Sequence, residues 1–244
     1  MAGRYGGAVM ITLSYLIWIY LISYSGSIFS AMLAKLPFFG NISESVTSDI
    51  IFTVISALIF SLLNIIAGMF QCGINLYYLN ISTGRDAQPA DLFAGFRSDP
   101  AKVFKVSAFI MFPTIITSVI FNIFAELYVL THDQRFFILS WATLVPALAI
   151  TLYMNLTYGM AYFLLLDFPK YPASRILSLT RKKITGHRMR LLLLDLRFIP
   201  MLLLCILSMG LGILWVYPIL SESHALFFLN LMNPDHYVPI DERV

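Results

Sequence analysis

The stretch IIFTVISALIFSLLNIIAGMFQCGINLYYLNISTG, residues 50–84, contains no charged side chain. An α-helix needs about 20 apolar residues to cross the roughly 30 Å hydrocarbon core of a bilayer, so this run is long enough to span it. Because no water reaches the backbone there, the amide and carbonyl groups must bond to one another, and a helix achieves this within one segment. The stretch therefore predicts a transmembrane helix.

Similar uncharged runs recur along the chain. Hydrophobic residues make up 59% of the 244 residues, charged residues only 12%, and the mean hydropathy is +0.82, which leaves too little polar surface to cover a water-soluble domain. We therefore predict an all-α, polytopic transmembrane helical bundle that forms a single integral membrane domain over residues 1–244. Its five spans are the runs Tyr5 to Ala34, Ile50 to Gly84, Val106 to Ala125, Phe136 to Leu166 and Phe198 to Ser221.

After the fifth run, Ile219 to Met232 is a candidate sixth segment that dips into the interface. Pro218, Glu222 and His224 argue against a full crossing, because a proline removes a helical hydrogen bond and ionisable groups are costly in hydrocarbon. Whether this segment crosses the membrane or lies on it stays open.

The distribution of Lys and Arg predicts the orientation of the chain. Thirteen of the sixteen lie before the first run, between the second and third, or between the fourth and fifth; the exceptions are Lys35, Arg135 and Arg243. Cytoplasmic loops of membrane proteins carry an excess of these residues. The pattern therefore predicts a cytoplasmic N-terminus in the cell membrane and, for five spans, an external C-terminus.

Between the second and third runs, residues 83–89 are typical of a turn, and we expect Asp91 to cap a short helix after it. The side chains of Leu92, Phe93 and Phe96 share one face of that helix. This face indicates either a loop helix that packs on the bundle, which we favour, or a segment that lies on the lipid.

The connection after the fourth run is strongly basic. Pro172 is expected to open a helix that Gly186 ends. Its apolar face, Ala173, Ile176, Leu177, Thr180 and Ile184, is expected to lie along the inner leaflet, where each near-surface cation gains about 1 kcal/mol from anionic lipid. The basic patch that faces lipid or a protein partner comprises Arg175, Arg181, Lys182, Lys183, His187, Arg188 and Arg190. The alternative is that these cations serve only to fix orientation.

Two ionisable residues enter the fifth run. Asp195 and Arg197 point about 200° apart on a helix, so they cannot pair with each other. We expect Arg197 to reach back to the interface and Asp195 to form a structural ion pair with Arg175 or Lys170.

Other polar residues lie inside the runs. The amides of Asn64, Asn122 and Asn155, together with Gln71 and Asn75, are expected to bond between helices, and a polar pathway is the alternative. Pro113, Pro146 and Pro200 are expected to bend their helices, and Ser208 with Gly212 offers a close helix contact.

Catalytic signals are absent from the sequence. His132, His187, His224 and His236 are assigned to scattered loops, and no HExxH, CxxC or GxSxG spacing occurs. We expect no enzyme activity, no cofactor, no metal site and, since no aromatic residues alternate with the cations, no nucleic-acid partner.

Several motifs resemble those of the bacterial integral-membrane family known as domain of unknown function 975. They are Gly73 with Leu79, Asp91 to Arg97, Ala173 to Ser178 leading to Gly186-His187-Arg188, and Gly210 to Val216. The similarity extends from about Phe70 to Met232 and implies a multi-pass protein of the cytoplasmic membrane with no assigned activity.

Three functions remain open. A non-catalytic scaffold or accessory subunit of a membrane complex fits the sequence best and predicts a protein partner or a second copy, besides anionic lipid. The main alternative is a transporter or channel for a small solute or lipid, with a pathway lined by residues such as Asn64, Asn122 and Asn155. An intramembrane enzyme would need two ionisable groups at one depth.

Overall fold

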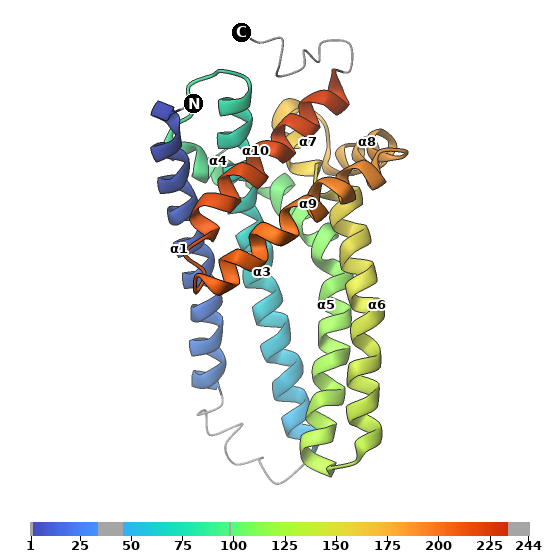
Figure 1. Cartoon of the computed structure of the whole chain (residues 1–244). Coiled ribbons are helices and arrows are strands. Elements are labelled where there is room, and N and C mark those ends of the chain that lie inside the picture. The colour runs from blue at the N-terminus through green and yellow to red at the C-terminus, as the bar shows by residue number, and fades with distance from the viewer. Residues whose placement is uncertain (1, 34–45, 98, 234–244) are drawn as a thin grey trace. The chain divides into compact units, whose positions relative to one another are not determined.

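The computed structural model describes residues 2–33, 46–97 and 99–233, and every regular element in these ranges is a helix (Figure 1). The predicted all-α class is therefore confirmed. The elements in chain order are α1 (Ala2–Leu33), α3 (Val46–Ser82), the 3-10 helix η1 (Pro89–Phe93), α4 (Ala94–Arg97), α5 (Pro100–Thr131), α6 (Gln134–Tyr158), α7 (Ala161–Asp167), α8 (Ala173–Ile184), α9 (Arg188–Leu207) and α10 (Ile213–Met232).

Four helical segments in the described residues are long and apolar enough to cross a membrane. They correspond to the first four predicted spans. Pro113 and Pro146 lie inside α5 and α6, which continue through them. The four segments are Gly6–Met32, Ile50–Ser82, Pro100–Thr131 and Gln134–Asp167.

The predicted fifth span is not confirmed, because its residues do not form one helix. α9 ends at Leu207 and α10 begins at Ile213, and the intervening residues form a turn. Met209 and Gly210 have φ values of 53° and 86°, the left-handed conformation that ends a right-handed helix. The expected close helix contact of Ser208 with Gly212 is therefore wrong: the Gly212 amide donates to Ser208 Oγ across 2.9 Å and helps to close the turn.

The described residues fall into two compact units. Unit 1 consists of the described residues within Met1–Leu16, Met69–Val106 and Leu156–Val244, and unit 2 of those within Ile17–Gly68 and Ser107–Asn155.

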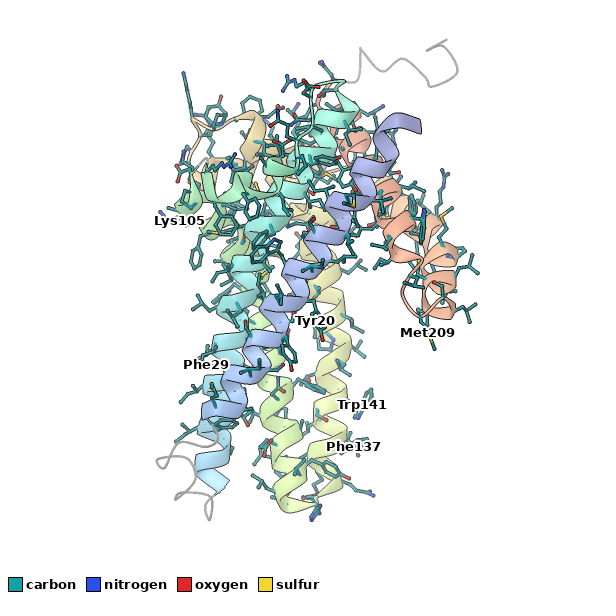
Figure 2. All side chains as sticks on the ribbon, turned by 90° about the vertical axis from the view of Figure 1, so that its left-hand side faces the viewer. Tyr20, Phe29, Lys105, Phe137, Trp141 and Met209 are labelled. Carbon is teal, nitrogen blue, oxygen red and sulfur yellow. The ribbon has the colours of Figure 1, made fainter. Side chains whose placement is uncertain are left out.

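Unit 2 consists of long helical segments with few polar links. Ser30 Oγ donates to Ser56 Oγ across 3.3 Å, and the hydroxyls of Thr114 and Thr151 lie 3.3 Å apart. Many of its aromatic side chains project outward, as Figure 2 shows for Tyr20, Phe29, Phe137 and Trp141, which are 40–70% exposed. An apolar exterior of this kind suits a hydrocarbon environment.

In unit 1, the α3 backbone lies directly against η1 and α4. A β-carbon at Gly73 would collide with the carbonyl oxygen of Leu92, and one at Gly95 would collide with the carbonyl oxygen of Met69. Only glycine, at Gly73 on α3 and at Gly95 on α4, lets the two backbones lie this close. Leu92 is only 2% exposed as a result.

The short helix was predicted to begin at Asp91, but it begins earlier. Gln88 is the residue at its N-terminus, and Asp91 Oδ2 accepts a hydrogen bond from the Gln88 amide across 3.0 Å. The same oxygen also accepts from Asn80 Nδ2 of α3 across 3.0 Å. The rings of Phe93 and Phe96 meet Phe70 edge-on, at centroid distances of 5.8 and 5.0 Å. The element is therefore a loop helix packed on the protein, the interpretation favoured from the sequence.

Candidate functional site

Helix α8 forms where the sequence predicts it. Pro172, which comes just before the first helical residue, has an extended backbone. Gly186, with φ of 92°, follows the last turn. Arg181, Lys182 and Lys183 occupy that last turn, where cations interact favourably with the negative end of the helix dipole. Pro172 and Gly186 thus set the two ends of α8, Ala173 and Ile184, through their backbone conformations.

The apolar face of α8 is buried by the protein itself. Ile176 and Ile184 are fully buried, Thr180 is 1% exposed, and α8 packs against α7 and α10 of unit 1. The expectation that this face lies on the inner leaflet is therefore wrong. An interfacial helix needs a free apolar face to enter lipid, and here the protein core occupies it.

The opposite face of α8 is exposed and cationic. Arg181, Lys182 and Lys183 are exposed, and so are His187 and Arg190 beyond the helix. Arg175, also exposed, holds its guanidinium 4.3 Å from the centre of the Tyr171 ring. Arg188 differs from the rest of the predicted patch because it is half-buried. We call the side chains of Arg175, Arg181, Lys182 and Lys183 the α8 basic face.

The partner expected for Asp195 was wrong. Its carboxylate lies 2.7 Å from His224 Nε2, and His224 stands in α10 and not in a loop. The two residues are 29 positions apart in sequence, and the turn at 208–212 brings them together. Arg197 is exposed, and its expected reach to the membrane interface stays a prediction.

A partly buried polar network connects α1, α3 and α10 inside unit 1. Tyr15 donates to Gln71 Oε1 across 2.5 Å, and Gln71 Nε2 donates to Asn75 Oδ1 across 3.1 Å. Tyr217 of α10 stacks on Tyr15 with 5.5 Å between ring centres.

A separate hydrogen bond between α1 and α3 joins the Thr12 and Tyr78 hydroxyls across 2.7 Å. Sequence reasoning named Gln71 and Asn75 but missed the tyrosines. The spacing of 71, 75 and 78 places the α3 members on one helix face, and this pattern could have revealed the group.

The other amides of the candidate spans do not form a shared polar group in the described residues. Asn64 Nδ2 donates to the Phe60 carbonyl and Asn122 Nδ2 to the Ser118 carbonyl, both across 2.7 Å and both within their own helix. Asn155 is exposed. Among the residues that the structure describes, no group of three or more His, Cys, Asp or Glu could hold a metal ion.

Comparison with known proteins defines the class. Residues 23–234 match the model of the family described as protein of unknown function (DUF975). The chain belongs to this uncharacterised family, as the sequence motifs indicated. No curated protein and no solved structure matches the chain.

Proposed function

We propose that this protein is a multi-pass protein of the cytoplasmic membrane that acts as a non-catalytic scaffold or accessory subunit, and that its α8 basic face docks an acidic protein partner. The observation that carries the proposal is the division of α8 into a buried apolar face and an exposed cationic one. A helix held in this way presents fixed charges to the solvent side.

Charge placement supports a cytoplasmic position for this face. All thirteen Lys and Arg that the sequence assigns to the cytoplasm fall within the ranges of unit 1. Of the other three, Lys35 and Arg135 fall within those of unit 2 and Arg243 within those of unit 1. Under the positive-inside rule, the unit 1 ends of the spans, the N-terminus and α8 are then on the cytoplasmic side.

A protein partner explains α8 better than lipid does. Binding to a lipid surface would rest on charge alone, since the apolar face of α8 is occupied by unit 1. An acidic protein surface can match fixed cations individually, which speeds association and makes it dependent on salt. Guanidinium groups such as those of Arg175 and Arg181 can also bind carboxylates with two hydrogen bonds each.

The main alternative, a transporter or channel, has less support. The sequence predicted a pathway lined by residues such as Asn64, Asn122 and Asn155. In the structure, however, the side-chain amides of Asn64 and Asn122 donate to carbonyls of their own helices. Such bonds satisfy the amide locally and contribute nothing to a shared polar path. This arrangement favours the scaffold.

The test is affinity purification of the full chain in native nanodiscs, followed by mass spectrometry. The triple variant Arg181→Gln, Lys182→Gln and Lys183→Gln is compared with a matched control, Arg85→Gln, Arg97→Gln and Lys105→Gln, whose side chains are exposed in unit 1 outside α8. Both variants lose three positive charges.

We expect the α8 variant to lose a co-purifying acidic protein that the control keeps, and high salt to release that protein from the wild type. Retention of the same partners by both variants would refute the docking role. Loss of binding to anionic liposomes, with protein partners unchanged, would instead assign the α8 basic face to lipid.

A further inference from the structure

The helices α9 and α10 form an antiparallel hairpin within unit 1 (Figure 1). Asp195 meets His224, and Arg190 Nη1 donates to Asn230 Oδ1 across 3.3 Å. The guanidinium of Arg190 also lies 5.7 Å from the centre of the Phe227 ring. The two residues of each pair lie about equally far from residue 210 in the sequence. The helices α9 and α10, the two arms of the hairpin, therefore run side by side from the turn to their charged ends.

The turn end of the hairpin is apolar and exposed. Met209 is 96% exposed, and its side chain projects from the tip in Figure 2. Its exposed apolar neighbours are Leu203, Leu204, Ile206, Leu207 and Leu211, at 56–80%. No charged residue occurs from Phe198 to Ser221, whereas Arg188 and Arg190 stand at the open end. A water-soluble surface would not present such a patch without a covering.

Each arm has the length of one leaflet. From Arg197 to Ser208 and from Gly212 to Glu222 the uncharged arms measure about 15–17 Å at 1.5 Å per residue, which is half of the roughly 30 Å hydrocarbon core. A straight helix over Phe198–Ser221 would have spanned that core. The folded arms reach only its middle.

The polar network places Tyr217 inside the membrane by contacts with other helices. Tyr15, which stacks on Tyr217 of α10, lies about 14 Å along α1 from Gly6, where the first span begins. Gln71, its hydrogen-bond partner, lies about 16 Å from the end of the second span at Ser82. Both segments are longer than the about 20 residues of one crossing, so their ends extend past the hydrocarbon core and Tyr217 lies less deep than these distances. The turn at 208–212 ends five residues before Tyr217 in the chain, farther from the charged ends of the hairpin.

We infer that α9 and α10 form a re-entrant hairpin. It enters the membrane from the side on which the α8 basic face lies and returns to that side, and the acyl chains of lipid surround its tip. Phe228 holds α10 against α7, since its ring stacks on that of Phe163 with 5.1 Å between ring centres. The turn is compatible with this depth because its amides at Gly210 and Gly212 donate to Cys205 O and Ser208 Oγ. The end of α10 then faces the cytoplasm, in contrast to the external C-terminus that five spans predict.

The first experiment measures what covers the tip. The natural cysteines, Cys72 and Cys205, are free thiols, so both are replaced by alanine to leave one labelling position. A nitroxide is then attached to Met209→Cys in the full-length protein, which is reconstituted in liposomes. We expect frequent collisions with oxygen and rare collisions with a water-soluble nickel chelate. Frequent nickel collisions would place the tip in water, and rare collisions with both reagents would place a protein over it; either result overturns the inference. Lys182→Cys on α8 is the water-exposed control.

The second experiment measures sidedness. Asn233→Cys, an exposed position just after α10, and Lys182→Cys are each treated with a membrane-impermeant maleimide in intact cells and in inverted vesicles. We expect both to react only in inverted vesicles. Reaction of Asn233→Cys in intact cells would show a fifth crossing and refute the hairpin. Neither experiment requires that the α8 basic face bind a partner, so the two proposals fail independently.

Discussion

The contact of α3 with η1 makes Gly73→Ala the most informative single change in unit 1. The added methyl group would overlap the Leu92 carbonyl oxygen and lie 2.8 Å from the Asp91 carbonyl oxygen. Both atoms belong to the backbone, so no side-chain rotation relieves the overlap. Either η1 must move away from α3 or the helix must distort.

The expected magnitude follows from three contributions. Alanine gains up to about 1 kcal/mol over glycine in helix propensity. Overpacking costs about 1–3 kcal/mol. Displacement of η1 also exposes part of Leu92, whose full burial is worth about 1.5–3 kcal/mol, and strains the bond from Asn80 to Asp91. We therefore expect the free energy of unfolding to fall by about 1–3 kcal/mol.

The assay is unfolding of the purified protein in detergent micelles, followed by circular dichroism during a titration with a denaturing detergent. Gly6→Ala is the matched control, because a β-carbon at this helical glycine has no atom within 4 Å. We expect Gly6→Ala to unfold at or above the wild-type midpoint and Gly73→Ala well below it. Equal midpoints for the two variants would refute the backbone contact.

Gly95→Ala tests the same interface from its other side, since its methyl group would meet the Met69 carbonyl. Once one substitution has displaced η1 and α4, the second has less contact left to break. The double variant should therefore lose less stability than the sum of the two single losses. A purely additive result would show that the two glycines act at separate contacts.

Three further outcomes are expected. Tyr15→Phe should lower the free energy of unfolding by about 1 kcal/mol in the same titration, because Gln71 loses its hydroxyl donor; an unchanged midpoint would show that the network is not formed. Lys102 holds the pKa of Asp99 below its ordinary value through a hydrogen bond, so Lys102→Met should raise that pKa in an NMR titration of the carboxyl carbon. The stabilisation from a lowered pKa is present at neutral pH and is lost as the pH falls through the folded-state pKa, so the variant should lose this acid sensitivity. Ile176→Ala should cost about 2–5 kcal/mol and expose α8 to trypsin, whereas unchanged digestion would show that α8 is held by other contacts.

The spans and α8 could be predicted from the sequence because their signals are local. Long uncharged runs mark the four segments that could cross a membrane, and Pro172 with Gly186 marks the ends of α8. Each of these features acts on the backbone within a few residues of its own position. No knowledge of distant contacts was required.

The hairpin could not be predicted in the same way. Residues 198–221 are uniformly uncharged and long enough to cross a bilayer, and Gly210 and Gly212 are common residue types in transmembrane helices. The left-handed conformation of Met209 has no local sequence signal. Because the turn was missed, the pairing of Asp195 with His224 was missed with it, as was the stacking of Tyr15 on Tyr217.

The burial of Ile176 and Ile184 also affects the thermodynamics of any encounter with α8. A disordered basic peptide that folds only when bound loses about 2–5 kcal/mol of its gross interaction energy to conformational ordering. Here the folding of the protein has already ordered the helix, so its cations meet a partner without that entropic penalty. The difference corresponds to roughly 30-fold to several thousand-fold in affinity for the same set of contacts.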